Sequence, residues 1–360
     1  MLWDPDRLRV FLDISTFCNA GCPQCHRTDP NGLGKADWLP LIQWDLKMFQ
    51  KAFPPKEVLK INRFNICGTF GDPIMTKDFM EICQYIVKCN PFAEVSVDTN
   101  GSIRDETWWW LLGAKIGKSL KVTFDVDGIN QEMHSKYRRF TSLEKVLANM
   151  QALSSTNAVV SSQTILFKHN QNYKEEIKQL VLQYGSTNHS FVVSDRFDKH
   201  SSVDGKRYFI DENGNEDYLE EADPESVPNG VITGTQSRTL KSEIKCLWAL
   251  PRNEVVINPD GQVLPCCFHG NSHYRSRMLT SHDPAFNENV IYSDGYNKDL
   301  KSYNVFHTPL SEIIRSEWYT KTLPDSMKGD NPVRQCVNHC SSRINKTHQL
   351  RENQKLVDNP

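Results

Sequence analysis

Strand-like and helix-like segments alternate through about the first two hundred residues, and this alternation restricts the possible fold more than any other feature. Apolar residues recur at helical spacing over residues 76–89, 141–153 and 173–185. Such alternation predicts βα units around a parallel sheet, either open or barrel-like. Several strand candidates are β-branched or apolar runs, as expected for strands covered on both faces. The candidates span residues 9–14, 60–67, 93–99, 120–126, 159–167 and 190–194.

The chain changes character after residue 200, and we divide it there. Residues 201–244 are polar, acidic and rich in turn formers, which predicts a linker or insertion. Residues 245–343 form a second compact region with a strand pair around the turn signal Pro259-Asp260-Gly261. Residues 344–360 are a polar tail. Within the first region, Thr141 and Glu144 fit a capping box.

The composition limits the classes of function that are possible for this chain. The chain has 360 residues, enough for one large domain and a smaller one. Its hydrophobic content of 38% and net charge of −2 suggest neither disorder nor attraction to nucleic acid or anionic membrane. It contains no apolar run that could span a bilayer and no signal-peptide pattern at its start. We therefore expect a cytoplasmic protein, in which 11 cysteines favour metal ligands or buried thiols over disulfides.

Three cysteines follow the first strand candidate. The stretch CNAGCPQCHR places Cys18, Cys22 and Cys25 at C-x3-C-x2-C spacing. In parallel α/β folds the ligand-binding loops follow the carboxyl ends of strands. A structural zinc ion normally takes four protein ligands. Three thiolates suit a [4Fe–4S] cube whose fourth iron is left for a ligand that is not protein. A zinc knuckle with a distant fourth ligand, or buried thiols, is the alternative.

This loop resembles the cluster loop of the radical S-adenosylmethionine (SAM) superfamily. In that family SAM chelates the open iron of the [4Fe–4S] cluster. One electron then cleaves SAM to methionine and a 5′-deoxyadenosyl radical, which removes a hydrogen atom from the substrate. The resemblance implies a partial (β/α)6 barrel of the TIM type for residues 1–200. One position departs from the family: Gln24 stands where an aromatic residue usually packs near the SAM adenine.

The sequence CGTFGDP after the second strand candidate looks like the family's Gly-Gly-Glu-Pro loop, which binds the SAM amino group. The matching positions are Phe70, Gly71, Asp72 and Pro73. Aspartate keeps the charge of glutamate but shortens its reach, and Phe70 departs from the family's glycine. An ordinary Gly-Asp-Pro turn is the alternative.

Two further segments extend the resemblance over about residues 9–193. Thr99 and Asn100 resemble the family's turn after the third strand, although Asn-Gly is also a plain turn signal. After the fourth strand, Asp125 stands where the family commonly has serine, and Arg138 aligns with its arginine. By resemblance Asp125 would face the ribose or methionine part of SAM. Arg138 would pair with the SAM carboxylate, which suits its planar fork.

Five more cysteines lie in the C-terminal region, and their pattern looks like the auxiliary-cluster extension called twitch, the shorter relative of SPASM. Gly261 and Cys266 fit its glycine-x4-cysteine feature. Neighbouring strand residues point opposite ways, so only one of Cys266 and Cys267 should face a metal. A structural zinc site is the alternative. The resemblance implies one auxiliary [4Fe–4S] cluster in a small α+β domain, held by Cys246, Cys266, Cys336 and Cys340.

We therefore expect a radical SAM enzyme that abstracts hydrogen from a peptide or protein side chain, with oxidation of a small molecule as the alternative. The polar segment 204–230 would cover an extended substrate. The resemblance implies an electron donor such as a flavodoxin or ferredoxin. The rivals from other classes are a zinc-binding adaptor without catalysis and an electron carrier with two clusters. The sequence assigns no catalytic side chain.

Overall fold

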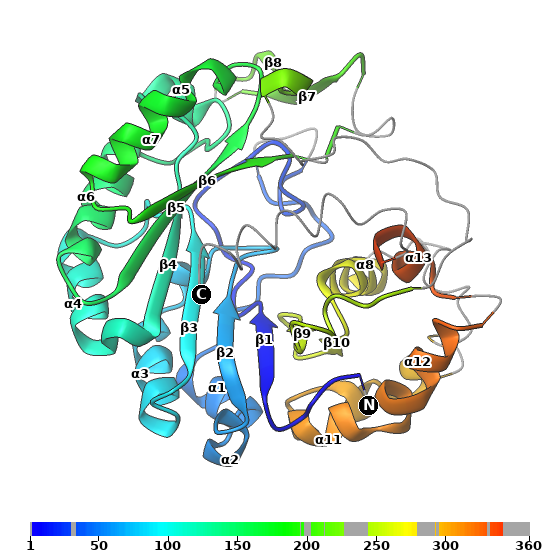
Figure 1. Ribbon diagram of the computed structural model, residues 1–360. Coiled ribbons are helices and arrows are strands. Elements are labelled where there is room, and N and C mark those ends of the chain that lie inside the picture. The colour runs from blue at the N-terminus through cyan, green and yellow to red at the C-terminus, as the bar shows by residue number, and fades with distance from the viewer. Residues whose placement is uncertain are drawn as a thin grey trace.

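An eight-stranded sheet is the centre of the computed structural model, which describes residues 2–29, 34–194, 196–197, 203–211, 213–226, 244–278, 292, 295–329 and 332–340. Six neighbouring strands pair in parallel in chain order, and the order ends at two edges, so the barrel is open (Figure 1). This confirms the predicted partial barrel and all six strands, which are β1 Leu8–Leu12, β2 Ile61–Ile66, β3 Glu94–Thr99, β4 Leu120–Asp125, β5 Val159–Leu166 and β6 Asn188–Val193.

Helices cover the convex face of the sheet (Figure 1). Apolar strand residues such as Val10, Phe64 and Val122 point toward them and are buried. None of the described helices is both long and apolar enough to cross a membrane. The covering helices are α1 Leu46–Ala52, α2 Pro55–Val58, α3 Phe79–Cys89, α4 Glu106–Ile116, α5 Gln131–Ser135, α6 Leu143–Ser154 and α7 Lys174–Gln183, with one-turn helices η1 Pro73–Met75, η2 Gly117–Ser119 and η3 Gln171–Tyr173.

The alternate strand residues point to the concave face, and many of them are polar. On β1 to β4 this set includes Arg9, Arg63, Glu94 and Lys121, which are only partly buried. The two carboxylate oxygens of Glu94 pair with Arg63 and Lys121, each at 2.6 Å. The inside of the partial barrel therefore offers charge and hydrogen bonds rather than an apolar filling.

The C-terminal region extends the same sheet. Strand β9 (Glu254–Ile257) pairs in parallel with β1, and β10 (Val263–Leu264) pairs antiparallel with β9. Gly261 in the connecting turn has φ of +86°, a conformation that favours glycine. The predicted strand pair and its turn are thus confirmed. The elements that follow are α8 Cys267–Met278, η5 Tyr296–Tyr303, α11 Leu310–Arg315, η6 Trp318–Thr322, α12 Leu323–Ser326 and α13 Arg334–Cys340.

The segment predicted as a linker contains an antiparallel hairpin, which the sequence did not suggest. Its strands are β7 (Lys206–Ile210) and β8 (Glu216–Glu220), and η4 (Pro224–Ser226) follows. Phe209 and Leu219 of the hairpin share a buried cluster with Cys22. The remaining linker residues, 227–243, and the predicted tail, 344–360, lie outside the described residues.

One predicted helix start is displaced by a residue. Ser142, not Thr141, is the N-cap of α6, because its side chain accepts a hydrogen bond from Lys145 N. The Thr141 hydroxyl instead donates to Arg138 O at 2.6 Å and contacts His134 Nε2 at 3.0 Å. The capping box with Glu144 is therefore wrong, although the helix itself is confirmed.

Candidate active site

The loop after β1 gathers Cys18, Cys22 and Cys25 beside one buried cluster that also contains Ala20 and Tyr137. All three thiols are free. Burial raises the pKa of Cys18, and the charge of Asp72 and of the two neighbouring cysteines raises it further. No three His, Cys, Asp or Glu side chains within the described ranges converge as a single metal ion would require. A cube, by contrast, spreads its thiolates over separate irons.

Hydrogen-bond donors point at two of these sulfurs. Cys18 Sγ accepts from Ala20 N at 3.4 Å and from Asn100 Nδ2 at 3.7 Å. Arg138 Nη1 lies 4.0 Å from Cys22 Sγ. Donors to cysteine sulfur stabilise the thiolate and tune an iron–sulfur cluster. The set of three thiols with their N–H donors therefore fits a [4Fe–4S] group.

The loop after β2 lies directly against the segment that leads into Cys18. A Cβ atom at Gly71 would lie 2.3 Å from Ser15 O and 2.7 Å from Phe17 O. Asp72 N donates to Phe17 O at 2.7 Å. Gly71 thus permits a backbone contact between the two predicted loops that no other residue would allow.

Asp72 joins the ends of β2 and β3. Its carboxylate accepts from Thr99 Oγ1 at 2.9 and 3.0 Å, from Asn100 N at 2.9 Å and from Ile74 N at 3.0 Å. Burial raises the pKa of Asp72, and these donors oppose the rise. The structure thus brings the predicted residues Asp72, Thr99 and Asn100 together, but it already engages both oxygens of Asp72 with protein donors.

Asn100 links the cluster loop to the end of β3. Besides its contact with Cys18, its Nδ2 donates to Asn19 Oδ1 at 2.9 Å. Its Oδ1 accepts from Ser102 N at 3.0 Å and Ser102 Oγ at 2.9 Å. These bonds fix the amide so that its N–H faces the sulfur. The sequence did not predict a role for Asn19 or Ser102. The only signal is that both are turn-forming residues beside the predicted motifs.

Arg138 is held between two carboxylates at the end of β4. Its Nη1 lies 3.0 Å from Asp125 Oδ2, and its Nε lies 2.6 Å from Asp127 Oδ2. Burial alone would lower the Arg138 pKa, but the two carboxylates hold it well above its ordinary value. Burial raises the pKa of Asp125, and the positive charge of Arg138 opposes this rise. Gln163 from β5 also donates to Asp125, at 2.7 Å, a contact that sequence reasoning missed.

The other residues predicted to contact SAM have partners within the chain. Phe70 is buried in a separate group, with its ring centroid 5.0 Å from that of Tyr274 and 5.8 Å from that of Trp38. Pro73 opens η1, which Asp72 caps. Gln24 Oε1 accepts from Ser194 Oγ at 2.6 Å, at the end of β6.

The four predicted auxiliary ligands also lie together. The Cys340 thiol donates a hydrogen bond to Cys246, which lowers the Cys246 pKa. Burial raises the pKa of Cys266, and the charges of Cys267, Cys246 and Cys336 raise it further. Cys267 opens α8 and lies within electrostatic reach of Arg252. Cys246 and Cys336 thus lie within electrostatic reach of Cys266.

His269 is a further residue at this second site. Its Nε2 lies 3.3 Å from Cys336 Sγ, and its Nδ1 contacts the Tyr292 hydroxyl. Burial lowers the pKa of His269 to about 3, so the ring is neutral. The sequence does not link His269 to these cysteines, apart from its place three residues after Cys266.

Two family models match the chain. Residues 12–181 match the model described as the Radical SAM superfamily. Residues 246–341 match SPASM, described as an iron-sulfur cluster-binding domain. The first match contains the three-cysteine loop and the ends of β2 to β4, and the second contains the four C-terminal cysteines. The second description supports an iron–sulfur cluster over zinc at the C-terminal site.

Curated relatives are similar to part of the chain. GTP 3′,8-cyclase of Clostridium perfringens (strain 13 / Type A) is 25% identical over 182 residues, which is 49% of this chain and 50% of the relative. The chain thus spans about half the length of the curated relatives it matches.

Two solved structures share the fold. Native anSMEcpe with bound AdoMet has a TM-score of 0.54 at 12% identity, covering 94% of this chain and 91% of that one. Streptococcus suis SuiB bound to precursor peptide SuiA has a TM-score of 0.55 at 10% identity, covering 93% and 76%. At these identities the likeness concerns the fold alone.

Proposed function

This chain belongs to the radical SAM superfamily and carries a C-terminal SPASM domain, and from this premise we propose that it is an enzyme that removes a hydrogen atom from a peptide or protein side chain. The observation that carries the proposal is the loop of Cys18, Cys22 and Cys25. Donors from Asn100 and Arg138 converge on its sulfurs. Three thiolates leave the fourth iron of a cube open.

The three cysteines would hold the SAM-cleaving [4Fe–4S] cluster. When bound, the cluster and SAM supply one electron and a carbon radical that abstracts hydrogen. Burial raises the pKa of the Cys22 thiol to about 12, so its proton must leave when iron binds. Arg138 opposes that rise and stabilises the thiolate. Asn100 does the same at Cys18 through its N–H.

The SAM contacts divide into positioning and binding roles. Asp72 already accepts hydrogen bonds at both oxygens, so we assign it to positioning Thr99 and Asn100. Gly71 lets the loop backbone approach the cluster loop, which suits binding of the SAM amino group by carbonyls. Asp125 and Arg138 would face the ribose and the carboxylate, with Arg138 shared between SAM and its two protein partners.

The C-terminal site would hold an auxiliary [4Fe–4S] cluster through Cys246, Cys266, Cys336 and Cys340. His269 beside Cys336 would orient that ligand or donate to its sulfur. A cluster fully ligated by cysteine relays electrons, so we assign it that role.

Two observations support a peptide substrate. The concave face is polar over several strands, which suits an extended chain with many hydrogen-bonding groups. A solved structure of the same fold is described as bound to a precursor peptide. We further infer an electron donor such as a flavodoxin or ferredoxin. The 11 cysteines of the chain favour a reducing compartment, for which we propose the cytoplasm.

Release of 5′-deoxyadenosine tests the activity. Protein purified and reconstituted without oxygen is mixed with SAM and dithionite, and the nucleoside is quantified by mass spectrometry. We expect release from the wild type and none from Cys22→Ala. Cys89→Ala is the matched control, because this thiol ends α3 on the outer face and should keep the activity. A wild type that carries iron yet releases no 5′-deoxyadenosine would contradict the proposal.

A further inference from the structure

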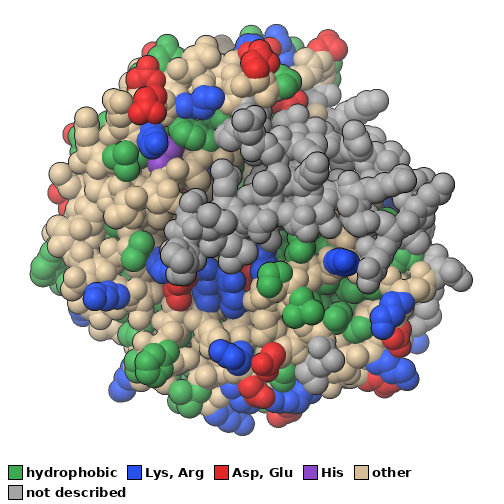
Figure 2. Space-filling view, viewed as in Figure 1, with side chains coloured by type: hydrophobic (Ala, Val, Ile, Leu, Met, Phe, Trp, Pro, Cys, Tyr) green, Lys and Arg blue, Asp and Glu red, His purple; other side chains and the backbone are tan. Residues whose placement is uncertain are grey.

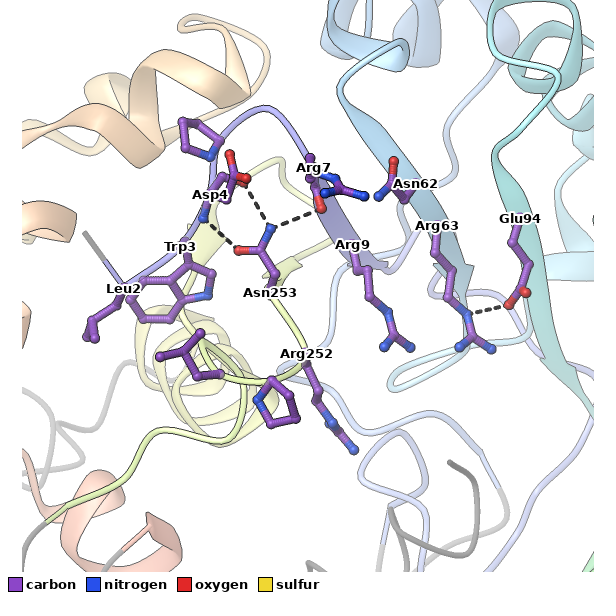
Figure 3. A pocket seen from close by; sticks show the side chains of 13 residues that line it. Leu2, Trp3, Asp4, Arg7, Arg9, Asn62, Arg63, Glu94, Arg252 and Asn253 are labelled. Atoms are coloured by element: carbon purple, nitrogen blue, oxygen red, sulfur yellow. Dashed lines mark hydrogen bonds and ion pairs between the residues drawn. The ribbon is translucent and has the colours of Figure 1, made fainter. Parts of the chain in front are cut away.

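A cavity of about 750 Å³ opens at the amino-terminal ends of the central strands. Its size falls within the range of small-molecule sites. Figure 3 shows the guanidinium groups of Arg9, Arg63 and Arg252 extending to the same side, from β1, from β2 and from the turn before β9. In Figure 2 basic side chains gather near the middle of the face seen in Figure 1. None of the predicted SAM or cluster ligands lines this cavity.

Positive charge exceeds negative charge around the cavity. Glu94 pairs with Arg63 and with Lys121, each at 2.6 Å. Arg252 Nη1 lies 3.8 Å from Glu254 Oε2. Arg9 lies within electrostatic reach of Glu254, Arg63 and Glu94. Asp4 and Arg7 also line the cavity, so five cations face three carboxylates in and beside it.

Arg9 contributes a buried donor to this network, and neighbouring Glu254 contributes a buried acceptor, Oε1, that likewise has no hydrogen-bond partner among the described residues. The Arg9 Nε is buried and has no hydrogen-bond partner among the described residues. Burial lowers the Arg9 pKa, and neighbouring Arg63 lowers it further. A buried donor without an acceptor is destabilising. An anion in the cavity would remove that cost and the repulsion between the arginines.

We propose that this cavity binds a doubly charged oxyanion group of the substrate, either two carboxylates or one phosphate. The planar fork of arginine matches both groups through paired N–H donors. Two negative charges would balance the excess of the five cations over the three carboxylates in and beside the cavity. This inference rests on the proposed function, because it assigns the cavity to the substrate of that enzyme.

The position of Arg9 on β1 gives the approximate distance between the bound anion and the edge of the sheet where the cluster loop begins. Arg9 precedes the end of β1, Leu12, by three residues, and both the cluster loop and the SAM loops begin at that edge. At about 3.3 Å per residue the anion would lie about 10 Å from the edge. An extended peptide would cover this distance with about three residues. The substrate would therefore carry its doubly charged group about three residues before or after the side chain that reacts.

Calorimetric titration of the reconstituted holoprotein tests the site without SAM or reductant. The probes are inorganic phosphate and glutarate, with acetate as the singly charged comparison. We expect saturable binding of phosphate or glutarate, tighter than acetate, and the better probe identifies the source of the charge. Arg9→Gln and Arg252→Gln should each weaken binding about tenfold or more, since a charge-assisted hydrogen bond is lost. Higher salt should weaken binding as well.

Arg315→Gln is the matched control, because this arginine pairs with Asp6 at 2.8 Å outside the cavity lining and should leave affinity unchanged. Circular dichroism checks that each variant is folded, and Arg9→Lys, which keeps the charge, should fall between wild type and Arg9→Gln. Absence of saturable binding, or equal loss in Arg315→Gln and Arg9→Gln, would overturn the inference. Failure of the proposed function would instead appear as missing 5′-deoxyadenosine in a protein that still binds the anion.

Discussion

Replacing Gly71 with alanine tests whether contact between the β2 loop and the cluster loop is needed to assemble the site. The new Cβ would lie 2.3 Å from Ser15 O and 2.7 Å from Phe17 O, and both acceptors are backbone atoms that cannot rotate away. An ordinary contact needs about 3.4 Å or more, so one loop must shift by about 1 Å. Overpacking of this kind costs about 1–3 kcal/mol of folding stability. A shift of about 1 Å at a reacting site can cost about 100-fold in rate.

The assay is iron per chain after reconstitution, together with 5′-deoxyadenosine release and the thermal midpoint. Gly71→Ala should lose iron from the N-terminal site, release about 100-fold less nucleoside and unfold at lower temperature. Gly34→Ala is the control, because no described residue beyond its chain neighbours has an atom within 4 Å of the added Cβ. A Gly71→Ala protein with wild-type iron and turnover would refute the close approach of the two loops.

Three more changes follow from the buried charges and ligands. Arg138→Gln leaves Asp125 and Asp127 buried without their cation, so urea unfolding should show a loss of about 3–5 kcal/mol; a loss under about 1 kcal/mol would contradict the pairing. Burial raises the pKa of Asp13 from 3.8 to about 7, so its contribution to stability is full below about pH 4 and is lost as pH rises through 7. Asp13→Asn should flatten the fall in thermal midpoint between pH 5 and 8, and an unchanged slope would disprove that assignment. Cys336→Ala should lower bound iron while reductive SAM cleavage continues. Unchanged iron in this variant would contradict a cluster at the C-terminal site.

The strands could be predicted because several of them are apolar or β-branched runs, as strands packed against helices need. The hairpin β7–β8 could not, because its residues are mostly polar and only Phe209 and Leu219 face a core. The N-cap of α6 was predicted one residue too early, because the side chains of Thr141 and Ser142 can both cap a helix. Only the tertiary contact of Thr141 with His134 decides between them.

The cysteine sets could be predicted from spacing and resemblance, but their surroundings could not. The pairing of Arg138 with Asp125 and Asp127 depends on where the chain returns after β4. The contact of His269 with Cys336 joins residues 67 positions apart. The basic cavity likewise arises from the sheet, because Arg9, Arg63 and Arg252 are distant along the chain and meet only through strand pairing.

Metal content tests the central claim most directly. Iron, sulfide and zinc per chain are measured after oxygen-free purification and reconstitution, for the wild type and for a variant with Cys18, Cys22 and Cys25 changed to alanine. The account predicts about eight irons in the wild type and about four in the variant, since each cluster holds four. About four irons with one zinc in the wild type would keep the radical enzyme and make the C-terminal site structural. Zinc without iron in both proteins would contradict the account.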